Sequence, residues 1–291
     1  MLGLMLHLPV LHSQSESPDQ DRDSLTELTV PSFANSVLLR EAKGILVNTF
    51  GELERYAIES LVAGETPKVY AVGPMIDVEG NRQFQFQSQS QSSKRSYYKK
   101  WLDEQPKGSV VLLCFGSRGG FTNPMQVREV AAGLEKSRHR FLWVLRRAHA
   151  AVGGDRVEEV EEGLPEGFEG RVEGRGMVCE WVDQVGVLGH RAIGGTWPMY
   201  AEQQLNAFYM VREKGLAVEM RLDCRLGGGG LVTAEEVERG VNEVMEKENE
   251  VRRRVEEMSK RSREAVGEGG SSLASLRQFV HDLLNNYKVL D

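Results

Sequence analysis

Cysteine is scarce in this sequence, which contains only Cys114, Cys179 and Cys224. Three scattered cysteines are too few for a disulfide framework or a zinc site, and two of them stand in apolar runs that resemble buried strands. The chain therefore lacks the cysteine usage of small secreted domains. This usage favours a reducing compartment, and we expect a cytoplasmic protein.

Long hydrophobic runs and an excess of basic charge are also missing. The apolar opening MLGLMLHLPVL is too short to cross a bilayer and lacks the basic leader of a secretory signal. The 36 basic residues are outnumbered by 43 acidic ones, which gives a net charge of -7 and leaves no basic excess for nucleic acid. The sequence thus predicts no membrane span and no nucleic-acid partner.

The motifs of several enzyme classes are absent as well. The sequence contains no Ser/His/Asp order, no metal-ligand spacing and no P-loop. We therefore expect neither a metal ion nor a bound cofactor. These absences leave a soluble globular chain whose function depends on its remaining patterns.

The chain does contain a clear alternation of strand and helix patterns. Its 40% hydrophobic content is enough for one or two domains over 291 residues. The runs SVVLLCF and RFLWVLR suit strands buried on both faces, and helical patterns separate the runs. Between residues 109 and 222 this alternation predicts an α/β fold, with a Rossmann-like parallel sheet and helices on both faces.

Local signals predict where several helices begin. Asn123 before Pro124 is a helix start, and Thr233 with Glu236 forms a capping box. A last helix is expected from about residue 271. Its apolar face would comprise Leu273, Leu276, Val280, Leu283 and Leu284.

Residues 181–203, WVDQVGVLGHRAIGGTWPMYAEQ, form the run richest in groups that could hold a sugar nucleotide. Trp181 offers a ring that can stack on a base, and Gln184 offers an amide. An acid and an amide, Glu202 and Gln203, close the run. Stacking combined with polar recognition of hydroxyl groups is what a uridine diphosphate sugar requires.

This run resembles a known sequence feature. WVDQVGVLGHRAIGG and TWPMYAEQQLNAF are similar to the two ends of the donor-binding box of plant UDP-glycosyltransferases of secondary metabolism. WLDEQPKGSVVLLCFGS and HRFLWVLRR resemble the start of the nucleotide-binding half of that family. The resemblance covers residues 44–284 with gaps and implies a two-domain fold of the GT-B type. It also implies glucose transfer from UDP-glucose to a hydroxyl of a small flavonoid, phenolic or terpenoid acceptor.

The resemblance implies roles for individual residues. Trp181 would stack on uracil, the backbone of Val182 would contact the uracil edge, and Gln184 would hold the ribose. Alternatively, Trp181 could be an ordinary core or rim tryptophan, and an acid-amide pair at a helix start could be a solvated cap. The remaining donor-binding residues implied by the resemblance are Ser117, near the diphosphate, and Glu202 and Gln203, on the glucose hydroxyls.

The chain departs from the family pattern at two places in the box. Asp183 stands where proline is usual, which predicts a looser turn. Gly195 is joined directly to Thr196, where the family has a segment HCGWNS, a helix and a returning strand. Two parallel strands need a crossover of roughly a dozen residues, so residues 192–198 supply at most one strand or extended connection. We therefore expect an incomplete donor pocket.

No catalytic residue can be assigned. In the family, a histidine near the start of the N-terminal domain, oriented by an aspartate, takes the proton of the acceptor hydroxyl. His7 and His12 lie in a segment that does not resemble that start, and His190 lies in the box at a place with no base role. A surface or capping role is expected for His190.

The resemblance also suggests how the chain is divided. Residues 1–76 would be a remnant of the N-terminal acceptor domain, 77–96 a flexible low-complexity linker, 97–270 the nucleotide-sugar domain and 271–291 a C-terminal helix. We expect a truncated and internally deleted transferase with impaired catalysis. The alternatives are a non-catalytic relic or gene-model fragment with weak nucleotide binding, or an unrelated nucleotide-binding module.

Overall fold

The computed structural model describes residues 4–6, 42–62, 67–76, 92–114, 123–145, 163–197, 209–220, 231–246, 248 and 250–287. The chain divides into two units. The large unit comprises residues 1–14 and 77–255, and the small unit comprises residues 15–76 and 256–291.

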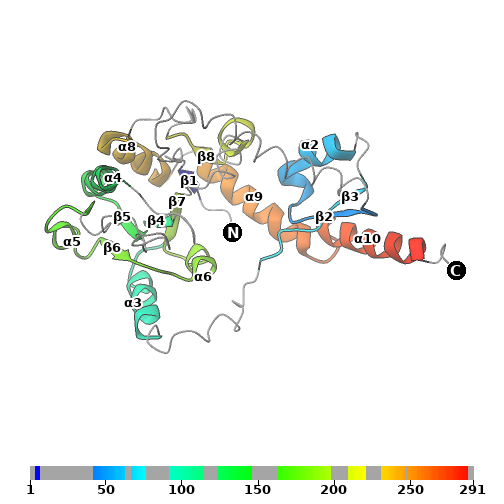
Figure 1. Cartoon of the computed structure of the whole chain (residues 1–291), viewed down its shortest axis with the longest axis horizontal. Coiled ribbons are helices and arrows are strands. Elements are labelled where there is room, and N and C mark those ends of the chain that lie inside the picture. The colour runs from blue at the N-terminus through cyan, green and yellow to red at the C-terminus, as the bar shows by residue number, and fades with distance from the viewer. Residues whose placement is uncertain are drawn as a thin grey trace, which may run out of the picture. The chain divides into compact units, whose positions relative to one another are not determined.

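The large unit contains a six-stranded sheet in which every pair of neighbouring strands is parallel (Figure 1). The strand order is β6-β5-β4-β7-β1-β8. This sheet confirms the predicted α/β fold class. The strands are β1 (Leu4–Leu6), β4 (Val110–Cys114), β5 (Arg140–Val144), β6 (Gly176–Cys179), β7 (Ile193–Trp197) and β8 (Ala217–Val218).

Helices cover both faces of this sheet. Figure 1 shows α4 (Pro124–Ser137) and α8 (Ala234–Met245) on one side, and α3 (Ser92–Asp103) and α6 (Gln184–Leu188) on the other. Alternate strand residues face opposite layers, because side chains in a strand alternate in direction. The core on the side of α3 and α6 is formed by Tyr98, Leu102, Val110, Leu112, Leu142, Val144, Met177, Val182, Val187 and Ala192.

Aromatic side chains fill the opposite face. Phe168, in the short helix α5 (Phe168–Arg171), has its ring centroid 6.1 Å from that of Phe141 and 6.4 Å from that of Trp143. All three side chains are buried. The continuous apolar runs of β4 and β5 are thus explained, since both faces of these strands lie in core.

Two predicted helix starts are confirmed by their caps. The Asn123 side chain accepts a hydrogen bond from the Met125 amide, with Pro124 in the first turn of α4. At α8, the Thr233 hydroxyl accepts from the Glu236 amide, while the Glu236 carboxylate accepts from the Thr233 amide. These reciprocal bonds satisfy amides that the first helical turn leaves without a partner.

Three elements of the large unit differ from the expected pattern. The helix α3 begins at Ser92, inside the segment predicted as linker, of which residues 77–91 lie outside the described part. The segment before β8 contains a π-helix, η4 (Tyr209–Lys214), which is a rare helix type. The strand β1 joins this sheet, although its segment was predicted to belong to the N-terminal remnant.

The small unit contains a two-stranded parallel sheet of β2 (Ile45–Val47) and β3 (Val69–Ala71). The helices α2 (Gly51–Val62) and α10 (Ser271–Tyr287) both contact β3. Two strands alone bury little surface, so the helices supply most of this core. The helix α9 (Glu250–Val266) crosses the boundary between the units after Val255.

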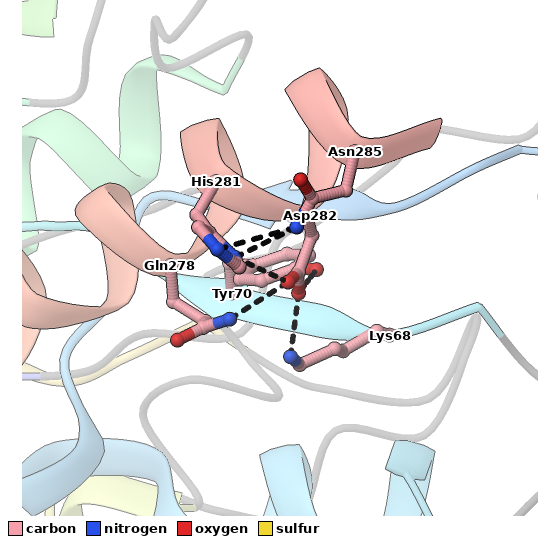
Figure 2. Close-up of polar contacts among 6 residues, drawn as sticks. All are labelled: Lys68, Tyr70, Gln278, His281, Asp282 and Asn285. Carbon is pink, nitrogen blue, oxygen red and sulfur yellow. Dashed lines mark hydrogen bonds and ion pairs between the residues drawn. The ribbon is translucent and has the colours of Figure 1, made fainter. Parts of the chain in front are cut away.

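A polar cluster fastens α10 to β3, and Figure 2 shows it as sticks. The Asp282 carboxylate accepts hydrogen bonds from Lys68 Nζ at 2.6 Å, Tyr70 Oη at 2.7 Å and Gln278 Nε2 at 2.7 Å. The Tyr70 ring also packs edge-on against Phe279, with centroids 5.2 Å apart. In contrast, the predicted apolar face of α10 is largely exposed at Leu276, Val280, Leu283 and Leu284.

Candidate functional site

The predicted donor-binding residues all follow the carboxyl ends of parallel strands. In the large unit, the chain leaves β4, β6 and β7 at the same edge of the sheet, because these strands run in one direction. Ligands of such folds bind beyond this edge. Trp181, Val182 and Gln184 follow β6 within the described part, whereas Ser117, Glu202 and Gln203 lie outside it.

The turn of residues 181–184 presents two polar or aromatic groups and buries one apolar group. Trp181 is 42% exposed, and Gln184 is exposed at the start of α6, whereas Val182 is only 5% exposed in the core beneath α3. An exposed indole next to an anchored valine does not fit a core tryptophan. The turn is therefore suited to stack the indole on a flat ligand.

Asp183, which the sequence predicts to loosen this turn, makes three polar contacts there. Its side chain accepts a hydrogen bond from the Gly186 amide at 3.1 Å and so caps α6. Its own amide donates to Tyr98 Oη at 3.0 Å, and its carboxylate lies 3.9 Å from Lys99 Nζ. Tyr98 was not identified from the sequence, because no local pattern relates a residue of α3 to this turn.

His190 has a structural role, as expected. Its Nδ1 accepts a hydrogen bond from the Ala192 amide at 3.2 Å, so Nε2 carries the proton and donates to Asp103 Oδ1 at 3.1 Å. Arg191 also donates to the carbonyl of Asp103, at 2.9 Å. These bonds join α6 to the end of α3, and the histidine has no nitrogen left to act as a base.

In the described residues 192–197 the structure has a single strand, β7, as predicted, and residue 198 lies outside the described part. Residues Ile193–Trp197 pair with β4 on one side and β1 on the other, and the joint between Gly195 and Thr196 lies inside the strand. The pairing with β4 is irregular beside Gly194, and a Cβ there would strike the carbonyl oxygen of Gly108. Gly194 is therefore needed for the close approach of two backbones.

No nucleophile or metal site emerges from the part of the chain that the structure describes. Burial raises the pKa of the Cys179 thiol to about 12, so this group stays protonated at neutral pH. Within the described ranges, no cluster of three or more His, Cys, Asp or Glu could hold a metal ion. None of the helices described there is long and apolar enough to cross a membrane.

A hollow of about 700 Å³ lies along α8, and its lining includes none of Trp181, Val182 and Gln184. Half of its lining residues are glutamates, and burial lowers the pKa of His139, which also lines it. An anionic nucleotide would be repelled there, so the hollow is not a candidate donor site. Its lining residues are His139, Glu235, Glu238, Arg239, Asn242, Glu243, Met245 and Glu246.

Comparisons with curated proteins identify relatives that match nearly the whole chain. UDP-glycosyltransferase 71K1 from Malus domestica is 42% identical over 97% of this chain and 68% of the relative. Anthocyanidin 3-O-glucosyltransferase 6 from Manihot esculenta is 39% identical over 98% of this chain and 83% of the relative. A scan against models of protein families found no match.

Solved structures of plant glycosyltransferases share the fold of this chain. A UGT transferase from Siraitia grosvenorii in complex with UDP matches with a TM-score of 0.76 and 38% identity, over 91% of this chain and 60% of that one. Medicago truncatula UGT71G1 complexed with UDP-glucose matches with a TM-score of 0.72 and 40% identity, over 84% of this chain and 55% of that one. The chain thus spans less than two thirds of these structures.

The parallel sheet, the turn after β6 and these matches define the class as a glycosyltransferase of the GT-B fold. The identity to curated relatives then assigns the family. The chain belongs to the plant UDP-glycosyltransferases.

Proposed function

We propose that this chain binds the uridine nucleotide of UDP-glucose at the carboxyl edge of its large sheet. The single observation that supports this proposal is the turn after β6, where Trp181 is exposed and Val182 is held in the core. An anchored turn with an exposed indole is a preformed stacking surface. Two similar structures are complexes with UDP or UDP-glucose, which favours the same ligand class.

The family resemblance supplies the individual roles that we propose. Trp181 stacks on uracil, the Val182 backbone contacts the uracil edge, and Gln184 hydrogen-bonds the ribose. The segments after β4 and β7 would hold the diphosphate and the glucose hydroxyls. The residues proposed for these contacts are Ser117, Glu202 and Gln203.

The proposed reaction is transfer of glucose to a hydroxyl of a small plant metabolite. The hydroxyl oxygen attacks the anomeric carbon, the bond to UDP breaks, and a base takes the hydroxyl proton. A relative named as an anthocyanidin glucosyltransferase favours a flavonoid acceptor over other phenolics or terpenoids. We further propose that residues 97–270 form the nucleotide-sugar domain, and that the scarcity of cysteine in the sequence reflects a cytoplasmic location.

We also propose that catalysis by this chain is impaired. The continuous strand β7 leaves no room between Gly195 and Thr196 for a crossover helix. Such a helix would direct backbone amides toward the diphosphate. The same observation favours the second candidate function, a non-catalytic relic that binds nucleotide weakly.

Calorimetry and an activity assay test both candidates. The purified chain is titrated with UDP and UDP-glucose, and UDP release is assayed with a panel of flavonoid and phenolic acceptors. UDP binding with slow turnover would support the impaired transferase, and binding without turnover would support the relic. Absence of UDP binding would reject the proposed site, and rapid glucosylation would reject impairment. Sequencing the transcript across the Gly195 to Thr196 joint checks whether the joint is present in the gene product.

A further inference from the structure

Tyr98 connects the core of the large unit to the turn that carries Trp181. Its side chain is 2% exposed and lies in the core cluster that also contains Val182. Its hydroxyl accepts the hydrogen bond from the Asp183 amide at 3.0 Å. A buried hydroxyl is costly unless it is hydrogen-bonded, and so is a backbone amide without a partner. This bond satisfies both groups at once.

Two hydrogen bonds restrain the turn at Asp183. The amide is held by Tyr98, and the carboxylate caps α6 through the Gly186 amide. The residue is therefore fixed on both sides between β6 and α6. Trp181 stands two residues before this point and Gln184 one residue after it, so their backbone positions depend on the same restraint.

The ion pair between Asp183 and Lys99 adds little to this restraint. The Asp183 carboxylate and Lys99 Nζ are 3.9 Å apart, and the side chains are 41% and 55% exposed, respectively, so water screens the attraction. The Tyr98 hydroxyl, by contrast, acts in the core. A mobile turn would lose conformational freedom when a nucleotide stacked on its indole, and that loss would weaken binding.

We propose that Tyr98 is a positioning residue of the nucleotide site, whose hydroxyl fixes the turn presenting Trp181 and Gln184. This inference rests on the proposed function, because it concerns binding of a uridine nucleotide to that turn. Tyr98 touches no ligand in this arrangement. It acts by keeping the stacking surface in place before the ligand arrives.

The test compares Tyr98→Phe with the unchanged chain by UDP calorimetry and by amide hydrogen exchange. Loss of the hydrogen bond to the Asp183 amide should weaken UDP binding about two- to tenfold and speed exchange at that amide. The matched control is Tyr70→Phe, which removes a tyrosine hydroxyl from the small unit and should leave UDP affinity unchanged.

A double substitution separates positioning from a general effect on folding. If Tyr98 acts through Trp181, Tyr98→Phe should cost less UDP affinity in a Trp181→Ala background than in the unchanged chain. Equal costs in the two backgrounds would overturn the proposal. Unchanged UDP affinity or unchanged Asp183 exchange in Tyr98→Phe would also overturn it, while leaving the proposed function intact. Failure of the unchanged chain to bind UDP would reject the proposed function, and this inference with it.

Discussion

At the scale of single residues, Asp183 makes two hydrogen bonds in the turn after β6. Asp183 replaces a proline that the family usually has, and proline has no amide to donate. Only a residue with an N–H can make the 3.0 Å bond to Tyr98, and only a short polar side chain can cap α6. The replacement therefore exchanges a rigid backbone for two hydrogen bonds.

Trp181→Ala should reduce the affinity for UDP without unfolding the large unit. Stacking of a base on an aromatic side chain contributes roughly 1 to 3 kcal/mol, which corresponds to about 5- to 150-fold in affinity. Calorimetry with UDP measures the change, and Trp181→Phe should recover part of it. Equal affinity of Trp181→Ala and the unchanged chain would show that the nucleotide binds elsewhere.

Gln126→Met should destabilise the large unit by about 2 to 4 kcal/mol. The buried Gln126 amide donates to the Val232 carbonyl and accepts from the Val232 amide, both at 2.9 Å. Methionine keeps the volume but leaves two buried backbone groups without partners. Denaturant unfolding measures the loss, and Met125→Ala at the neighbouring exposed position should change stability by less than about 0.5 kcal/mol.

At the scale of elements, the helices α4 and α8 pack at unusually short range. A Cβ at Gly133 of α4 would lie 2.5 Å from Val237 Cβ and 2.6 Å from the Ala234 carbonyl oxygen of α8. The absent side chain thus lets the helices meet. The short range also places the backbone before α8 within reach of Gln126.

Gly133→Ala should destabilise the large unit by about 1 to 3 kcal/mol, because the added methyl group forces the two helices apart. The matched control is Gly170→Ala in α5, where an added Cβ meets nothing within 4 Å. That change should be neutral or stabilise by up to about 1 kcal/mol. Thermal unfolding compares the two variants, and equal effects would contradict the close helix contact.

The contact of α10 with β3 should weaken in acid. Hydrogen bonds from Lys68 and Tyr70 hold the pKa of Asp282 below its usual range. The folded pKa is lower than the unfolded value of about 3.9, so the stabilisation is present above about pH 4 and is lost as the pH falls further. Amide exchange in α10 between pH 6 and pH 3 measures this loss.

Asp282→Asn is the control for this pH dependence. The variant should have a less protected α10 at pH 6, and a smaller additional loss of protection below pH 4. If the variant and the unchanged chain lost protection in parallel, Asp282 would not be the responsible group.

At the scale of the whole molecule, the described donor-site residues and their supports all belong to the large unit. Ligand binding to a folded unit stabilises it by mass action. At a hundredfold excess of UDP over its dissociation constant, the large unit should gain about 2.7 kcal/mol. Exchange of the strand amides of β4 to β7 checks this gain. Unchanged exchange at saturating UDP would contradict a site on this unit.

The fold could largely be predicted from the sequence where the signals are local. The apolar runs of β4 and β5 are confirmed as buried strands, and the caps at Asn123 and Thr233 are confirmed because capping depends on residues a few positions apart. The family could also be recognised from the box around Trp181. Of the predicted site residues, Trp181, Val182 and Gln184 are described and lie in the turn after β6. The roles of Ser117, Glu202 and Gln203 stay predictions.

The sequence by itself determined the alternation of elements, the caps and the family, because each depends on neighbouring residues. Only the tertiary structure decided that the segment Leu4–Leu6 lies between β7 and β8, and that Tyr98 holds the amide of Asp183. Such contacts join residues far apart in the chain, and no periodicity records them. They form only when burial in a shared core makes an unpaired hydroxyl or amide too costly.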